Sequence, residues 1–357
     1  MRWYKILIIC IVVIIGLPLL YLLFWPVPID PAAWTPSAAP ALTGAYEPNN
    51  RLASVARLGE GACIGPEDIA IDDRGRSYSG MVDGRILRFQ PDGSNPEVFA
   101  DTGGVPLGLR FDAAGNLVVA DCVKGLLAID PKGSVTVLST EQGGVPFRFT
   151  NDVDIAADGT IYFSDASFKF SLEHIMADLM EHRPNGRLLA YDPKTKTTRL
   201  VLDKLYFANG VAVSPDQSFV LVAETGKYRV QRYWLTGSRQ GESEIFIDNL
   251  PGFPDGISSN GKDTFWLALV SPRDPSVDAL LPRPFVRKII MRLPEAMMPA
   301  AKNYGFVLGL DTDGRVVHNL QDPSGAYAQI TNVVEYKGML YLGSLVENAI
   351  GRLPVPR

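Results

Sequence analysis

Residues 65–93 have the sequence GPEDIAIDDRGRSYSGMVDGRILRFQPDG, in which short apolar strands alternate with turns of the Asp-Gly kind. Such turns favour hairpins between antiparallel strands. Related units recur along the chain, at 106–133, 150–167 with 186–203, 208–235, 254–270 and 330–355. Units of three or four strands, spaced by about 40–50 residues, are typical of β-propeller blades. The copies therefore predict an all-β fold, a six-bladed β-propeller, in preference to a β-sandwich with additional elements.

Two of the units are interrupted by insertions that follow their second strand. Phe168–His182 has helical periodicity, and residues 272–300 combine a Pro-rich stretch with a short apolar helix candidate. Because both insertions leave the same edge of their blades, we expect them to lie on one face and to roof a central site. The last unit lacks an outer strand after Pro354, and Leu52–Leu58 (LASVARL) is predicted to supply it and close the ring.

The N-terminus contains an uncharged run of 20 residues, Ile6–Trp25. As a helix this run would be about 30 Å long, the thickness of a bilayer core, and it predicts an N-terminal transmembrane helix. Arg2 and Lys5 precede it, so the positive-inside rule places the rest of the chain on the extracytoplasmic side, whether periplasmic, lumenal or extracellular. A cleaved signal peptide is the alternative. The run is long for one, although the Ala-rich stretch Ala38–Ala41 leaves cleavage open.

Prolines dominate the segment that follows. Residues 26–50 hold six prolines among Ala and Ser, a composition typical of a stiff spacer without regular structure. The predicted organisation is a membrane anchor at 1–25, a Pro/Ala-rich linker at 26–50 and the propeller at 51–357.

The composition excludes some classes of partner and metal. The 357-residue chain has a formal net charge of −5 and no long basic run, which argues against nucleic acid as a partner. Its cysteines are Cys10 in the apolar run, Cys63 and Cys122. The last two could form one disulfide or remain free thiols. A CxxC pair or Cys/His cluster is absent from the sequence, which disfavours zinc.

Common catalytic motifs are also missing from the sequence. It contains no GxSxG, HExxH, P-loop or GxGxxG motif. The three histidines are His174 and His182 in the first insertion and His318 in a late strand. We interpret each as a surface or packing residue, so a serine-hydrolase triad is poorly supported.

Oxygen-bearing side chains occur where the first strands of four blades begin. In a propeller these innermost strands line the central channel, and their first residues lie at one mouth of it. The four residues are Glu67 (GPED), Asn151 (FTND), Asn209 (FANG) and Asp255 (FPDG). Any one of them alone would be an ordinary turn residue. Four at equivalent positions favour a site for a hard cation such as Ca²⁺, which takes about six to eight oxygen ligands.

The combined motifs resemble a known family. GPEDIAID, YSGMVDGRILRF, TNDVDIAADGTIYFSDAS, FANGVAVSPDQSFVLVAET, RYWLTG and DNLPGFPDGIS are similar to the strictosidine-synthase-like branch of the calcium-dependent propeller superfamily, over residues 50–354. This superfamily includes regucalcin/gluconolactonase, paraoxonase and diisopropyl fluorophosphatase. The group most similar is that of the adipocyte plasma-membrane-associated proteins, whose members are likewise held by an N-terminal membrane segment.

The resemblance implies a ligand set for the metal. The family's Glu, two Asn and Asp ligands match four residues of this chain, Glu67, Asn151, Asn209 and Asp255. Asp152 and Asp154 follow Asn151, where the family often has acidic neighbours. Asp154 is either a carboxylate behind the metal ligands or a turn residue.

Two departures from the family restrict the reaction. Strictosidine synthase has a glutamate in its last blade for amine chemistry, and this chain has Thr331 near that place, which disfavours a Pictet–Spengler condensation. Paraoxonase has a histidine dyad near its second blade, where this chain has Leu107. The paraoxonase-type base is therefore missing.

The resulting hypothesis is a Ca²⁺-dependent hydrolase of small-molecule lactones or aryl esters. The metal would polarise the carbonyl, water would be the nucleophile, and Asp255 would act as base, as the regucalcin resemblance implies. A non-catalytic propeller, stabilised by Ca²⁺ and binding a ligand or protein, is one alternative, and a lyase or condensing enzyme is another. Five apolar side chains of the insertions suggest a lid over the pocket, or packing on the blades: Phe168, Phe170, Leu172, Met176 and Phe285.

Overall fold

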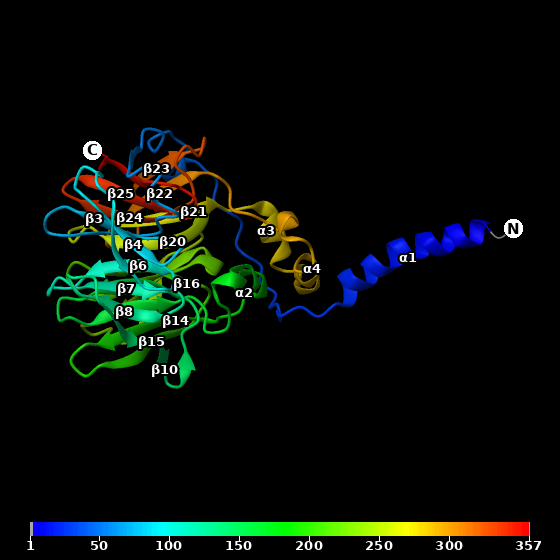
Figure 1. The fold of residues 1–357 in the computed structure, drawn as a ribbon, viewed down its shortest axis with the longest axis horizontal. Helices are drawn as coiled ribbons and strands as arrows, with labels where there is room; N and C mark the ends of the chain where they lie inside the picture. The colour runs from blue at the N-terminus through cyan, green and yellow to red at the C-terminus, as the bar shows by residue number, and fades with distance from the viewer. Residues whose placement is uncertain (1–2, 357) are drawn as a thin grey trace.

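The structure is a computed structural model that describes residues 3–356, without the side chains of residues 5 and 8–12. Arg2 and the side chains of Lys5 and Cys10, which entered the predictions above, therefore lie outside the described part of the chain. Six four-stranded sheets form the body of the molecule (Figure 1). Their inner strands contact one another in a closed cycle, which includes the pair β2 and β24. The all-β, six-bladed propeller is confirmed.

Each blade is an antiparallel sheet whose strands follow one another from the centre outwards. The first three blades consist of β2 (Ile69–Ile71), β3 (Ser77–Gly80), β4 (Arg85–Phe89) and β5 (Glu97–Asp101); β6 (Pro106–Phe111), β7 (Leu117–Asp121), β8 (Gly125–Ile129) and β9 (Val135–Ser139); and β12 (Thr150–Ile155), β13 (Ile161–Asp165), β14 (Gly186–Asp192) and β15 (Thr197–Leu205). A small hairpin of β10 (Glu141–Gln142) and β11 (Val145–Pro146) lies between blades two and three.

The second half of the ring repeats the arrangement. Its blades consist of β16 (Ala208–Val213), β17 (Phe219–Glu224), β18 (Arg229–Trp234) and β19 (Ser243–Ile247); β20 (Gly252–Ser259), β21 (Phe265–Pro272), β22 (Gly305–Leu310) and β23 (Val316–Asp322); and β24 (Ile330–Tyr336), β25 (Met339–Ser344) and β26 (Ile350–Pro354), completed by β1 (Ala56–Leu58).

The ring is closed by the N-terminal strand. β1 pairs antiparallel with β26, with Ala56 opposite Arg352 and Leu58 opposite Ile350. Just before β1, the side chain of Leu52 is fully buried in the core between blades five and six. The prediction that Leu52–Leu58 supplies the missing outer strand is confirmed, and the paired part is the last three residues.

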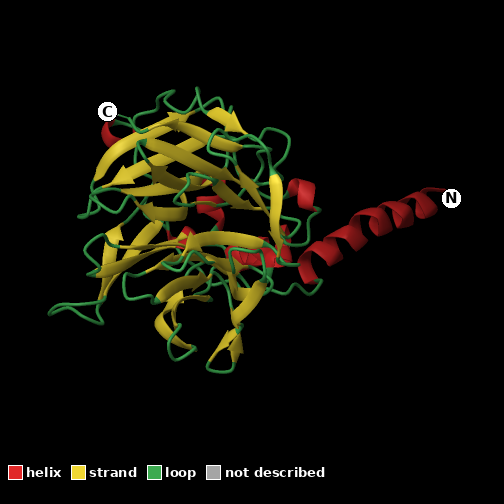
Figure 2. Cartoon of the chain, turned by 60° about the vertical axis from the view of Figure 1, so that its left-hand side comes forward, coloured by secondary structure: helices red, strands yellow, loops and turns green. Residues whose placement is uncertain are grey.

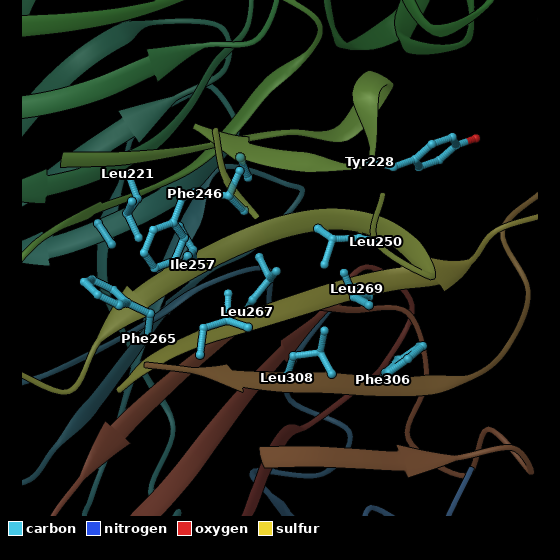
Figure 3. Close-up of a cluster of buried hydrophobic side chains, with 14 of the residues drawn as sticks. Leu221, Tyr228, Phe246, Leu250, Ile257, Phe265, Leu267, Leu269, Phe306 and Leu308 are labelled. Carbon is cyan, nitrogen blue, oxygen red and sulfur yellow. The ribbon is translucent and has the colours of Figure 1, made fainter. Parts of the chain in front are cut away.

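A separate apolar core fills each of the six interfaces between neighbouring blades. Figure 3 shows the one between blades four and five, where Leu221 and Phe246 face Ile257, Phe265 and Leu267. Because a blade has a neighbour on both sides, both faces of its central strands are buried. Every residue of β17 is accordingly buried. Each large side chain buried in this way contributes about 1.5–3 kcal/mol.

Both insertions lie on the face where the inner strands begin, which we call the roofed face (Figures 1 and 2). The first contains a short 3₁₀ turn, η2 (Leu172–His174), and α2 (Ile175–Glu181); the second contains α3 (Pro275–Leu280), α4 (Pro284–Ile290) and the turn η4 (Glu295–Met297). α4 contacts both α2 and α3. The prediction that both insertions lie on one face is confirmed, and we call these insertions the roof. The first helix is shorter than its periodicity suggested, because Ser167 Oγ accepts hydrogen bonds from the backbone of Lys169 and Phe170 and holds that stretch in a loop.

The Pro-rich linker differs from the free spacer that its composition predicts. Apart from the turn η1 (Gly44–Tyr46), residues 26–50 lack regular structure. They are nevertheless attached, because the amides of Ala32 and Trp34 donate to the carbonyls of Glu181 and Leu281, at the ends of α2 and α3. Ile29 is buried against Phe170 and Met180. The linker therefore forms part of the roof; the domain boundaries themselves stay a prediction.

The N-terminal residues form α1 (Trp3–Phe24), which projects from the roofed face (Figure 1). Within residues 3–356, no helix is found that is long and apolar enough to cross a membrane.

Candidate metal centre

The four predicted ligands lie at the starts of inner strands, on the roofed face. Glu67 precedes β2, Asn151 and Asn209 are the second residues of β12 and β16, and Asp255 lies in the first half of β20. The pairing register shifts at these residues in β12, β16 and β20. Such bulges re-aim side chains beside functional sites. The local fold thus presents these side chains to the channel rather than to a neighbouring blade.

All four side chains are nearly buried, with 9%, 5%, 4% and 6% of the surface of Glu67, Asn151, Asn209 and Asp255 exposed. The structure brings three of them together directly. Glu67 is close enough to Asp255 for their charges to interact, and the Asn209 side chain is close enough to the Asp255 carboxylate to affect its pKa. Asn151 shares the strand position and the burial of the other three.

The surroundings of this site disfavour the ionised forms of its carboxylates. Burial raises the pKa of Glu67 well above its usual value, and the negative charges of Asp255, Asp68 and Asp152 raise it further. Burial also raises the pKa of Asp255 to about 7, with the Asn209 hydrogen bond as the opposing effect. Holding such groups ionised away from water is costly unless a cation accompanies them. A bound cation would instead favour the ionised carboxylates and lower their pKa values.

Asn209 provides an independent indication of a ligand. Its side-chain oxygen is buried and has no hydrogen-bond partner among the described residues. Its amide nitrogen faces Thr225 Oγ1 at 3.3 Å. A buried carbonyl oxygen that lacks a donor suits coordination to a hard cation, and so do the two carboxylates beside it. The residues present therefore fit a Ca²⁺ ion.

A cluster of three or more His, Cys, Asp or Glu side chains that could hold a metal is not found in the described part of the chain. The predicted set contains two residues of these types, Glu67 and Asp255, and its other two members are amides.

Below the site, a second tier of side chains links the blades, which the sequence did not reveal. Asp68 accepts hydrogen bonds from the backbone amides of Ile69 and, in the next blade, Leu109. Asp152 accepts from Val153 and, in the next blade, Val211 in the same manner.

The residues that adjoin these carboxylates from other blades are glycine or asparagine. Asn332 donates to Asp68. A Cβ on Gly108 would lie 2.7 Å from the Asp152 carboxylate, and one on Gly256 2.7 Å from the Asn332 side chain. An Asp, Asn or Gly at this position of all six blades, namely residues 68, 108, 152, 210, 256 and 332, is the sequence signal that could have indicated these links.

Asp154 extends these links along the strand. Its carboxylate accepts from the amides of Ile155 and Val213 and pairs with Arg110 at 2.9 Å. Asp154 therefore links blades three and four. This role was not among the two considered from the sequence.

Comparison with known proteins agrees with this architecture. Profiles described as "Strictosidine synthase" and "Strictosidine synthase-like, N-terminal" match residues 151–238 and 44–89. Protein strictosidine synthase-like 13 of Arabidopsis thaliana is 36% identical, over 82% of this chain and 78% of the relative. The adipocyte plasma membrane-associated protein of Danio rerio is 35% identical, over 96% of this chain and 88% of the relative. The chain belongs to the strictosidine synthase-like family.

Solved structures show the same fold at lower sequence identity. A gluconolactonase from Xanthomonas campestris superposes with a TM-score of 0.63 at 19% identity, covering 92% of this chain and 99% of that one. A calcium-binding regucalcin from Agrobacterium tumefaciens gives 0.57 at 14% identity, covering 84% and 90%. At these identities the likeness concerns the propeller fold alone.

The structure also describes the two positions that restrict the reaction, Leu107 and Thr331. Leu107 is buried in an apolar cluster with Phe149 and Phe207, so the second blade offers no base there. Thr331 is buried, and its hydroxyl donates to the backbone carbonyl of Glu67. The sixth blade thus supports a ligand residue and contributes no carboxylate at Thr331.

The histidines and cysteines have packing roles or lie at the surface. His182 is buried and stacks on Trp34, with ring centroids 4.5 Å apart, and burial lowers its pKa to about 3. His318 stacks on Trp266, and His174 is exposed. Cys63 and Cys122 are free and buried, so the free-thiol alternative is the correct one.

Proposed function

We propose that this strictosidine synthase-like protein is a Ca²⁺-dependent hydrolase of small-molecule lactones or aryl esters. The observation that carries the proposal is the unpartnered oxygen of Asn209 beside two buried, uncompensated carboxylates at the mouth of the channel. Glu67, Asn151, Asn209 and Asp255 would hold the ion. When bound, Ca²⁺ supplies an electrophile that polarises a carbonyl and stabilises negative charge on its oxygen.

Asp255 is the candidate general base. Its carboxylate lies beside Glu67 and Asn209, where it could reach a water molecule next to the proposed ion. In the proposed reaction Asp255 takes a proton from water as the water oxygen bonds to the carbonyl carbon. The proton passes to the departing alkoxide or phenoxide oxygen as the carbon–oxygen ester bond breaks. The Asn209 amide orients the Asp255 carboxylate throughout.

A non-catalytic propeller remains the second candidate. It is favoured by the absence of an obvious histidine base. The second-blade position holds Leu107, and the buried histidine of the roof, His182, packs between Trp34 and Tyr206. In that case the same ion would act as structural support, and the roofed face would bind a ligand or protein. Thr331 in place of an acidic residue makes the lyase or condensing enzyme the weaker alternative.

We further propose that α1 holds the protein at a membrane with the propeller on the extracytoplasmic side. The support is the uncharged run Ile6–Trp25 and the name of the relatives, which are adipocyte plasma membrane-associated proteins. Extracytoplasmic Ca²⁺ is abundant enough for a weak, millimolar-class site.

The hydrolase proposal is tested with the full chain purified in detergent and assayed on lactones and aryl esters. We expect turnover that disappears with EGTA and returns with excess Ca²⁺. Asp255→Asn should lower kcat by about 10²–10⁴-fold, whereas Asp248→Asn, at an exposed site before blade five, should not. Turnover that persists in EGTA or in Asp255→Asn would contradict the mechanism. A melting point raised by Ca²⁺ without turnover would favour the non-catalytic candidate.

A further inference from the structure

Exposed apolar side chains gather in loops of the roofed face. Ile64, Val82 and Leu345 are 50%, 49% and 46% exposed, although each is a large apolar residue. Their loops adjoin, because the Val82 amide donates to the Ile64 carbonyl. A Cβ on Gly65 would also meet both Val82 and Leu345. The three exposed side chains therefore come from adjoining loops of this face.

The roof adds larger side chains to this face. Phe285 at the start of α4 is 57% exposed, and Met297 in η4 is 64% exposed. Phe168, at the beginning of the first insertion, is 38% exposed. Phe170, in contrast, is buried against Ile29, so it packs within the roof and is not part of a lid.

The opposite face has a different character. Its loops connect the first to the second and the third to the fourth strand of each blade, as at 72–76 and 130–134. Among the described residues, none of the exposed large apolar side chains lies in these loops. They are built instead from turns capped by their own carboxylates, such as Asp72 and Asp130.

The roof also holds the end of α1. Arg292, which follows α4, donates from Nε to the carbonyl of Trp25 at 2.6 Å and from a terminal nitrogen to that of Leu22 at 2.8 Å. A cation in this position satisfies the free carbonyls of the last helical turn. Figure 1 shows α1 leaving the molecule beside α2 and α4. This contact therefore keeps the end of α1 against the roof.

The charged side chains next to Phe285 in the sequence are basic and reach the surface. Arg283 is exposed and the Lys288 side chain is 36% exposed, whereas Arg273, Arg287 and Arg292 of the same insertion are buried. Basic side chains beside an exposed aromatic residue are attracted to anionic lipid headgroups.

We infer that the roofed face is a second membrane contact, which docks on a lipid surface with anionic headgroups and inserts Phe285 and Met297 into its interfacial layer. The inference rests on the proposed anchoring by α1 and extends it. The channel mouth then opens towards lipid, so the site would take amphiphilic ligands that partition into the membrane. Hydrophobic burial of both side chains and attraction of Arg283 and Lys288 to the headgroups supply the binding energy.

The test uses the full chain in a Cys10→Ser background, since Cys63 and Cys122 are buried. An environment-sensitive NBD label is attached to Phe285→Cys or Met297→Cys, and to Lys132→Cys on the opposite face as control. Each protein is reconstituted into vesicles of phosphatidylcholine with phosphatidylserine, and into phosphatidylcholine alone. We expect blue-shifted emission and quenching by nitroxide lipids at 285 and 297, stronger with phosphatidylserine, and neither effect at 132.

Two readouts separate the anchor from the docking. Flotation with the vesicles reports the anchor, and the label reports the docking. The docking would be overturned if the protein floats but its labels at 285 and 297 are as exposed to water as the label at 132. That result would indicate a protein partner for this face. Protein that does not float would overturn both.

Discussion

The amide nitrogen of Asn209 lies 3.3 Å from the hydroxyl oxygen of Thr225. The same hydroxyl donates its only proton to the carbonyl of Pro254 at 2.7 Å, so it can only accept from Asn209. The nitrogen of the Asn209 amide must therefore face Thr225, and the oxygen must face the centre of the channel. Thr225 thus orients a candidate calcium ligand without touching the site itself.

Substitution of Thr225 by Val should weaken calcium binding. The methyl group that replaces the hydroxyl offers no acceptor, so the Asn209 amide loses its fixed orientation. Loss of such a supporting contact costs about 10–100-fold in metal affinity. Calorimetric titration with Ca²⁺ measures this directly, with Thr225→Ser as the control that keeps the hydroxyl. Equal affinities for Thr225→Val and the wild type would show that Thr225 has no orienting role.

Glu67→Gln should have opposite effects with and without calcium. In EGTA the variant should be more stable near neutral pH, because burial and the nearby Asp255, Asp68 and Asp152 raise the pKa of Glu67, so that its folding requires uptake of a proton that the neutral amide does not need. The gain should be about 1–3 kcal/mol, the cost of an uncompensated buried group. In saturating Ca²⁺ the wild type should gain more stability than the variant.

Thermal melts under both conditions check this reversal, and the exposed Glu141→Gln serves as control. A Glu67→Gln variant that melts below the wild type in EGTA would indicate that Glu67 has a structural role unrelated to a cation.

Arg287 should control the order of the roof. Its fully buried guanidinium donates to the carbonyls of Met180 at 2.7 Å, Leu281 at 2.9 Å and Ala32, which joins α2, α3 and the linker. Lys has one compact ammonium and cannot bridge three segments. In Arg287→Lys we expect amide hydrogen exchange at Ala32 and Trp34 to accelerate at least about tenfold, equivalent to roughly 1.4 kcal/mol of local stability.

The blades provide the internal reference for this measurement, and Arg283→Lys, at an exposed position on the same insertion, provides the control variant. Acceleration spread equally through the blade strands would mean that Arg287 stabilises the whole propeller rather than the roof.

Acid should destabilise the protein partly through His182. Burial, with the charges of Lys227 and Arg287, lowers the pKa of His182 to about 3, whereas in the unfolded chain it is about 6.5. As the pH falls from about 6.5 towards 3, the unfolded state binds a proton that the folded state does not. The free energy of unfolding therefore decreases by up to about 1.4 kcal/mol per pH unit in this window, and is unaffected above it.

His182→Asn should remove this dependence, since Asn tolerates the left-handed backbone at this position, where φ is +50°. Urea denaturation of both proteins at pH 7.5 and pH 5 gives the difference. Parallel losses of stability on acidification in wild type and variant would contradict the proposed role of His182.

Ring closure could be predicted from the sequence, whereas the packing of the linker could not. A last blade that ends at Pro354 leaves an unpaired edge, and Leu52–Leu58 has the alternation of a strand that could cover it. Residues 26–50 have no periodicity, and the Arg287 side chain that holds Ala32 is 255 residues away in the chain. Nothing local indicates such a partner.

The candidate site was predictable to a similar extent. Glu67, Asn151, Asn209 and Asp255 recur at one position of the repeat, so alignment of the repeats brings them together. The partners of Asp68 and Asp152 are backbone amides of the next blade, which carry no mark in the sequence. The role of Thr225 likewise depends on the carbonyl of Pro254, 29 residues away.

The most direct test of the account is a calorimetric titration of the full chain with Ca²⁺, beside the double variant Glu67→Gln/Asp255→Asn. If these side chains hold the ion with Asn151 and Asn209, the wild type should show one saturable site and the double variant none. Absence of binding to the wild type, or an unchanged site in the double variant, would contradict the claim that the channel mouth is a calcium centre.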